Sequence, residues 1–111
     1  MLYLVHMIVE IPSTMPAEEA ARIKAEEKAY AQRLQQEGRW LHLWRVVGEY
    51  ANFSVFDVES NDALHEALSQ LPLFPYMKIT VTPLHLDLTH HGSIDGLRQR
   101  DFEKVLEVSL E

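Results

Sequence analysis

The stretch that decides the fold is WLHLWRVVGEYANFSVFDV, residues 40–58. It contains two runs rich in aromatic and β-branched residues, 40–48 and 51–58, and such runs predict β-strands. A short connection around Gly48 separates them, so we expect the two strands to pair as a hairpin. An isolated hairpin is marginally stable in water, and the flanking segments must therefore complete the sheet.

The segments on either side of this hairpin supply two helices and two more strands. Residues 2–11 predict a strand, and 16–37 predict a long helix that starts at a proline and stops at Gly38. Ser60 is a suitable cap for a second helix that runs to about Leu71, and 76–81 predict a last strand. The order β-α-β-β-α-β predicts an α+β, ferredoxin-like domain over residues 1–83, with an antiparallel sheet and both helices on one face.

The predicted strands are apolar on both sides, although two helices cover only one face of a sheet. In the strand at 40–48, alternation predicts Trp40, Trp44 and Val46 on one side and Leu41, Leu43 and Val47 on the other. A sheet that is apolar on both faces is usually covered on both. We therefore expect a second subunit to cover the free face, which gives a dimeric α+β barrel.

Composition excludes several classes of function. The chain has 111 residues, 47% of them hydrophobic, and a net charge of −7, which suits a globular domain without a nucleic-acid-binding face. It has no cysteine. The first residues lack the pattern of a signal peptide, and no segment approaches the roughly 20 apolar residues of a membrane span. We expect a cytoplasmic protein with no membrane or nucleic-acid partner.

One charged residue lies on the apolar stripe of the first predicted helix. Ala20, Ile23, Ala31 and Leu34 recur at helical spacing, and Glu27 falls on the same stripe. Burial raises the pKa of a carboxyl group and suits it to proton transfer near neutral pH. The alternative is that Glu27 lies at the edge of the stripe and reaches solvent.

Several other polar residues interrupt or adjoin apolar segments. They are His42, Arg45, Tyr50, Asn52 and Ser54 on the hairpin, and Lys24 and Lys28 beside Glu27. Each has an ordinary structural interpretation as a buried hydrogen-bonding residue, a cross-strand partner or a surface charge. His85, His90 and His91 are poorly spaced for a metal site, so we expect neither a metal nor another cofactor.

The chain resembles the muconolactone delta-isomerase family in a series of motifs that occur in order. These are KAEEK (24–28), AQRLQ (31–35), HLWR (42–45), YANFSVFDV (50–58) and LPLFPYM (71–77), together with Gly38 and Trp40. The resemblance covers about residues 1–83 and does not extend into the tail, 84–111. His6 stands where the family would be expected to carry a lysine.

The resemblance implies a cofactor-free isomerase of aromatic catabolism, in the catechol branch of the 3-oxoadipate (β-ketoadipate) pathway. The family converts muconolactone to 3-oxoadipate enol-lactone by moving a C=C bond within the lactone ring. Glu27 would then be the base that moves the proton, and His42, Tyr50, Asn52 or Ser54 would stabilise the dienolate. Arg45 or Lys24 would bind the substrate carboxylate. The resemblance also implies a homo-oligomer, typically a decamer built of dimers. From its own residues, we expect the tail, 84–111, to dock on a neighbouring subunit or to remain partly mobile.

Three other functions remain open from the sequence. A chloromuconolactone dehalogenase-like enzyme would use the same fold and eliminate chloride from a substituted lactone. A cofactor-free monooxygenase of the dimeric-barrel type would oxidise an aromatic substrate, and a non-catalytic barrel would bind a ligand without turnover.

Overall fold

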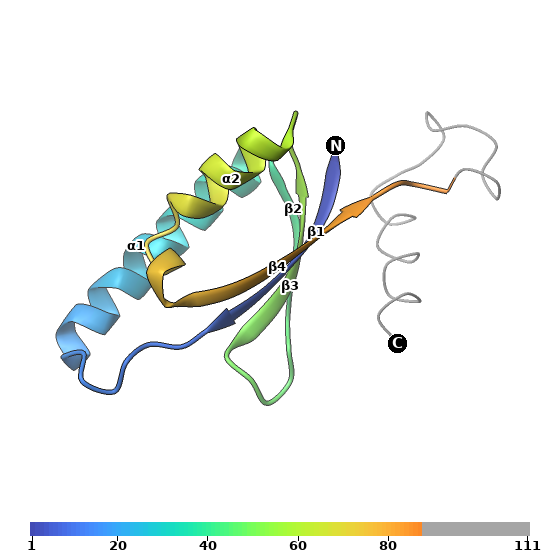
Figure 1. Ribbon diagram of the computed structural model, residues 1–111. Coiled ribbons are helices and arrows are strands. Elements are labelled where there is room, and N and C mark those ends of the chain that lie inside the picture. Colours follow the sequence, from blue (N-terminus) through green and yellow to red (C-terminus); the bar gives the residue numbers. More distant parts are fainter. Residues whose placement is uncertain (88–111) are drawn as a thin grey trace.

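The computed structural model of the chain describes residues 1–87, which form four strands and two α-helices in the predicted order (Figure 1). The elements are β1 (Leu2–Val9), α1 (Ala17–Gln36), β2 (Trp40–Arg45), β3 (Ala51–Asp57), α2 (Asn61–Ser69) and β4 (Met77–Leu84). A short 3₁₀ helix, Phe74–Tyr76, precedes β4. β4 continues past the predicted end of the last strand, and residues 88–111, which make up most of the predicted tail, lie outside the described residues.

The strands form one sheet in the order β2-β3-β1-β4, with every neighbouring pair antiparallel. Both helices pack on the same face of this sheet (Figure 1). The prediction of a ferredoxin-like α+β domain is therefore confirmed. β1 and β3 are the central strands, and β2 and β4 are the two edges.

The ends of α1 follow from the residues that flank it. Pro16 precedes the first turn, and Glu18 and Glu19 lie in that turn, where the positive end of the helix dipole favours acidic residues. The helix stops before Gly38, which has a φ of 77° that costs other residues energy. The Gly38 N–H donates to the carbonyl of Gln35 at 3.1 Å and closes the last turn.

α2 begins at the predicted cap and ends slightly earlier than expected. The Ser60 hydroxyl accepts a hydrogen bond from the Ala63 N–H at 3.1 Å. The helix ends at Ser69, and the turn that follows it leads through Pro72 to the 3₁₀ helix. The buried face of α2 consists of Leu64, Ala67 and Leu68.

The main core lies between the helices and the sheet. Alternate residues of β1 point into it, and they pack with side chains of α1, α2 and β3; its buried members are Tyr3, Val5, Met7, Leu34, Trp40, Phe56, Val58, Leu64, Ala67, Leu68 and Leu71. Two tyrosine hydroxyls at its edge are paired: Tyr3 donates to Asn61 Oδ1 and Tyr30 donates to the Ala67 carbonyl.

An irregularity in β2 changes which side chains face the helices. Trp40 pairs with Phe56 and His42 pairs with Val55, so Leu41 is an extra residue that has no partner position on β3. Trp40 faces the helices, and beyond the bulge the residues that share this face are Leu43 and Arg45. The prediction that Trp40 and Trp44 share a face was wrong, because alternation was applied to a strand that contains a bulge.

The face of the sheet away from the helices is also rich in apolar and aromatic side chains. Leu4, Ile8, Trp44 and Phe53 lie on it and are only partly buried. The rings of His6 and Phe53 stack there, with centroids 4.2 Å apart. Among residues 1–87, no helix is long and apolar enough to cross a membrane.

Candidate functional site

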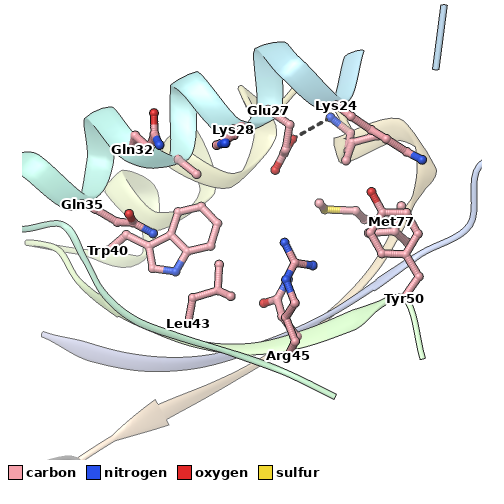
Figure 2. A pocket seen from close by; sticks show the side chains of 14 residues that line it. Lys24, Glu27, Lys28, Gln32, Gln35, Trp40, Leu43, Arg45, Tyr50 and Met77 are labelled. Carbon is pink, nitrogen blue, oxygen red and sulfur yellow. Dashed lines mark hydrogen bonds between the residues drawn. The ribbon is translucent and has the colours of Figure 1, made fainter. Parts of the chain in front are cut away.

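A cavity of about 600 Å³ lies between α1 and the sheet (Figure 2). One wall is the face of α1 that carries Glu27, and the opposite wall comes from β2, β3 and the turn that joins them. The segment before β4 closes one side. The lining residues are Val9, Lys24, Glu27, Lys28, Ala31, Gln32, Gln35, Trp40, Leu43, Arg45, Tyr50, Asn52, Leu73 and Met77.

Glu27 points from α1 into this cavity (Figure 2). Its side chain is half-buried beside apolar groups, and its Oε1 accepts a hydrogen bond from the backbone N–H of Leu73 at 2.9 Å. Burial raises the pKa of Glu27 above its ordinary value, and the Leu73 N–H partly offsets that effect because it stabilises the ionised form. Of the two interpretations that the sequence left open, the structure agrees with the one in which Glu27 faces the interior.

Three cationic side chains line the same cavity. Lys24 and Lys28 come from α1, and Arg45 approaches from β2 on the opposite wall (Figure 2). The Lys24 ammonium lies 5.5 Å from the centre of the Tyr50 ring. None of the three takes part in a salt bridge within residues 1–87, where the ion pairs lie elsewhere. The cavity is therefore locally positive in a chain whose net charge is −7, and it suits an anionic ligand.

Tyr50 and Asn52 place hydrogen-bonding groups beside Arg45. Burial raises the pKa of Tyr50, the Arg45 charge opposes the rise, and the Glu27 charge adds to it. The Tyr50 hydroxyl therefore remains a protonated donor at neutral pH. Asn52 lies opposite Arg45 in the pairing of β2 with β3, so the two side chains share one face of the sheet.

Ser54 lies behind Asn52 and does not line the cavity. It is fully buried, and its hydroxyl donates to Asn52 Oδ1 at 2.7 Å. This bond occupies the amide oxygen of Asn52 and leaves the NH₂ group as its donor for a ligand. Ser54 is therefore linked to the cavity only by its hydrogen bond to Asn52.

His42 is a second predicted site residue that does not line the cavity. It lies on the far face of the sheet, where its ring stacks on Trp44 with centroids 5.1 Å apart. Regular alternation places His42 and Arg45 on opposite faces, and the bulge at Leu41 is the reason that Arg45, and not His42, shares the face of Trp40 toward the helices.

Several residues of the cavity wall were not among the site residues predicted from the sequence. Gln32 and Gln35 lie four and seven residues after Lys28, on the same face of α1. Helical spacing from Lys28 could therefore have predicted both as lining residues. Trp40 and Leu43 form an apolar wall, and the Trp40 indole N–H is already bonded to the His42 carbonyl at 3.1 Å. The Leu73 N–H that binds Glu27 is a backbone group, so the identity of residue 73 could not have predicted this hydrogen bond.

A metal site is not apparent in the part of the chain that the structure describes. Residues 1–87 contain no group of three or more His, Cys, Asp or Glu side chains that could hold an ion. His85 lies within this range, and His90 and His91 lie outside it.

This cavity, in which the half-buried Glu27 and Arg45 come from opposite walls, occurs in a chain that matches a known family. The family model for muconolactone delta-isomerase matches residues 1–92. This chain belongs to the muconolactone delta-isomerase family. The resemblance proposed from the sequence motifs is thus confirmed, and the match includes both walls of the cavity.

Similar proteins carry the same family name. The chain is 69% identical over 84 residues to a muconolactone Delta-isomerase of Cupriavidus pinatubonensis, an alignment that covers 76% of this chain and 91% of that protein. It is 64% identical over 84 residues to muconolactone Delta-isomerase 1 of Acinetobacter lwoffii, covering 76% and 88% of the two chains.

Among solved structures, a crystal structure of muconolactone isomerase matches with a TM-score of 0.77 and 54% identity, over 85% of this chain and 95% of that one. A 5-chloro-2-hydroxyhydroquinone dehydrochlorinase from Burkholderia phenoliruptrix matches with a TM-score of 0.56 and 17% identity, over 78% of this chain and 96% of that one. The second match shows a shared fold only.

Proposed function

We propose that this chain is an isomerase that converts muconolactone to 3-oxoadipate enol-lactone in aromatic catabolism, by proton transfer that needs no cofactor. The observation that carries the proposal is the half-buried carboxylate of Glu27, whose pKa is raised, in a cavity lined by three cations. The family membership supports the same reaction.

Glu27 acts as the base in the proposed mechanism. It removes the proton from the ring carbon that carries the carboxymethyl arm, and the two electrons of that C–H bond pass through the unsaturated ring onto the lactone carbonyl. The resulting dienolate takes the same proton back from Glu27 at another ring carbon. The C=C bond has then moved, and no atom has been gained or lost. A carboxyl group whose pKa is raised toward the working pH suits both steps.

The opposite wall binds the substrate and its intermediate. Arg45 binds the substrate carboxylate, because guanidinium forms two parallel hydrogen bonds to a carboxylate, and Lys24 strengthens the positive field. Tyr50 and the Asn52 amide donate to the dienolate oxygen, with Ser54 orienting Asn52. His42 has no role in this mechanism, since it lies on the other face of the sheet.

The relatives favour isomerisation over the other functions considered. The similar proteins, at 51–69% identity, are named muconolactone Delta-isomerases. A chloromuconolactone dehalogenase would use the same base, so a chlorinated lactone belongs in the assay as a second substrate. Oxygen uptake with an aromatic substrate would instead indicate a monooxygenase, and binding without turnover would indicate a ligand-binding barrel.

The functional molecule in this proposal is a cytoplasmic homo-oligomer, with dimers as the unit of a decamer. Support comes from the partly buried apolar side chains on the sheet face away from the helices, including Leu4, Trp44 and Phe53. In such a dimer the two free faces meet and form the α+β barrel.

The experiment is a turnover assay with muconolactone and its chloro and methyl derivatives, on the wild-type protein and on Glu27→Gln. Glutamine keeps the shape of the side chain but cannot accept the proton, so kcat should fall by roughly 10²–10⁴-fold. Glu26→Gln is the matched control, because Glu26 is exposed and pairs with Arg22. Wild-type turnover by an assembled Glu27→Gln protein would remove Glu27 from the mechanism.

A further inference from the structure

We propose that the backbone N–H of Leu73 is a positioning group for catalysis, which holds one oxygen of the Glu27 carboxylate and leaves the other to exchange the proton with the substrate. This inference rests on the proposed function in that it takes Glu27 as the base. It adds a positioning segment, residues 71–76, that lies far from Glu27 in the sequence.

The hydrogen bond joins two separate parts of the fold. The Leu73 N–H donates to Glu27 Oε1 at 2.9 Å, across 46 positions of sequence. Among residues 1–87 it is the only hydrogen bond of the Glu27 carboxylate. Without it, rotation about the last bond of the side chain would exchange the two oxygens, and the carboxylate would have no fixed orientation in the cavity.

The segment that supplies this N–H is built to present it. Pro72 and Pro75 have no N–H, and the N–H groups of Leu71, Phe74 and Tyr76 donate to nearby backbone carbonyls at 2.9–3.1 Å. Within residues 71–76, only the Leu73 N–H donates to a residue of α1. Two prolines and a 3₁₀ turn restrict the backbone, so the donor is held in place before substrate binds.

The side chain of Leu73 fixes the same segment against α1. It is 3% exposed and packs in a small cluster with Val9 and Ile23. Ile23 lies four residues, about one turn, before Glu27 on the same helix stripe. The packing of the Leu73 side chain on α1 and the hydrogen bond of its N–H to α1 therefore both fix the position of this segment relative to Glu27.

The bond also adjusts the chemistry of the base. Burial alone would favour the protonated form of Glu27, and a donor on Oε1 favours the ionised form that can accept a proton. The Leu73 N–H thus keeps the base available, and the remaining oxygen has an unshared pair directed at the ligand.

The test replaces leucine 73 by its α-hydroxy acid through nonsense suppression, which changes the N–H to an ester oxygen and keeps the side chain. We expect the acid limb of the kcat/KM profile to move to higher pH, and kcat on the plateau to fall by roughly tenfold with KM little changed. The pKa of the Glu27 carboxyl, followed by carbon-13 NMR with Glu27→Gln for assignment, should rise in parallel.

One control separates positioning from folding. The same ester at Phe74 removes an N–H that binds the Leu71 carbonyl and should leave the acid limb in place. An acid limb and a Glu27 pKa that match the wild-type protein in the Leu73 ester would overturn the inference.

A second measurement needs no altered backbone. In the unmodified protein the amide proton of Leu73 should shift with the titration of Glu27, and Glu27→Gln should abolish that shift. An amide signal that does not respond to this titration would also overturn the inference. Both NMR readouts are independent of turnover, so failure of the isomerase proposal and failure of this inference give different results.

Discussion

Glu27 shows how the burial of one carboxyl group makes the stability of the fold depend on pH. Burial raises its pKa, so the folded protein binds the Glu27 proton more tightly than the unfolded chain does. Stability then falls as the pH rises from the ordinary carboxyl pKa, which is 4.5, through the raised native value. Above that window the full cost of keeping an ionised group half-buried is present.

The direction of this pH dependence leads to a prediction about stability. Glu27→Gln should be more stable than the wild-type protein at pH 7, and the difference should vanish below the unfolded pKa of the carboxyl group. Urea unfolding at a series of pH values, with Glu26→Gln as the exposed control, is the measurement. A Glu27→Gln protein that is less stable at pH 7 would mean that its ionised form is favoured in the fold.

Arg45 carries the second prediction at this scale. Arg45→Met keeps an extended side chain but removes the charge, so KM should rise by roughly 10–100-fold, the effect of losing a hydrogen bond to a charged group. Steady-state kinetics is the measurement, and Arg39→Met is the control, because Arg39 pairs with Glu37 outside the cavity. An unchanged KM with a lower kcat would instead place Arg45 at the reacting atoms.

At the scale of the element, the boundaries of the helices and the bulge in β2 decide which side chains meet. α1 presents Glu27 because it runs unbroken for 20 residues along the sheet. β2 presents Arg45 to the same cavity because Leu41 is bulged. Neither element forms the cavity alone, since Glu27 and Arg45 come from opposite walls.

The N-terminal cap of α2 gives the prediction at this scale. Ser60→Ala removes the acceptor of the Ala63 N–H and should lower the free energy of unfolding by about 1 kcal/mol. Chemical denaturation at equal protein concentration is the measurement. Ser69→Ala is the control, because the Ser69 hydroxyl is exposed and only donates to the Glu66 carbonyl. Equal losses in the two variants would show that the cap contributes little.

At the scale of the whole molecule, the two faces of the sheet differ in how well they are covered. The helices bury one face, and the other carries Leu4, Ile8, Trp44 and Phe53, which are partly buried. Large apolar patches on soluble proteins usually mark a contact with a partner.

The prediction at this scale is that the folded chain is always associated near neutral pH. The free sheet faces should meet across a two-fold axis, because this buries the same patch on both copies. Light scattering at low protein concentration is the measurement, and the expected mass is that of a dimer or a multiple of it. A folded species with the mass of one chain would show that the second face is covered within the subunit.

The sequence by itself determined what depends on neighbours along the chain. Helical spacing placed Glu27 on the apolar stripe, Gly38 and Ser60 marked helix ends, and the order of strands and helices predicted the sheet topology. Of the predicted site residues, Lys24, Glu27, Arg45, Tyr50 and Asn52 line the cavity. These results follow from local geometry and residue type, which a single chain carries in its own pattern.

The tertiary structure alone decided which side chains of β2 face the helices and which group forms a hydrogen bond with Glu27. The bulge at Leu41 exists only in the pairing of β2 with β3, and it sends His42 to the far face while Arg45 faces the cavity. Ser54 contacts Asn52 and does not line the cavity for a similar reason, since burial depends on what packs above the strand. The Leu73 N–H is a backbone group that almost every residue has, so only the folded chain shows which one meets the carboxylate.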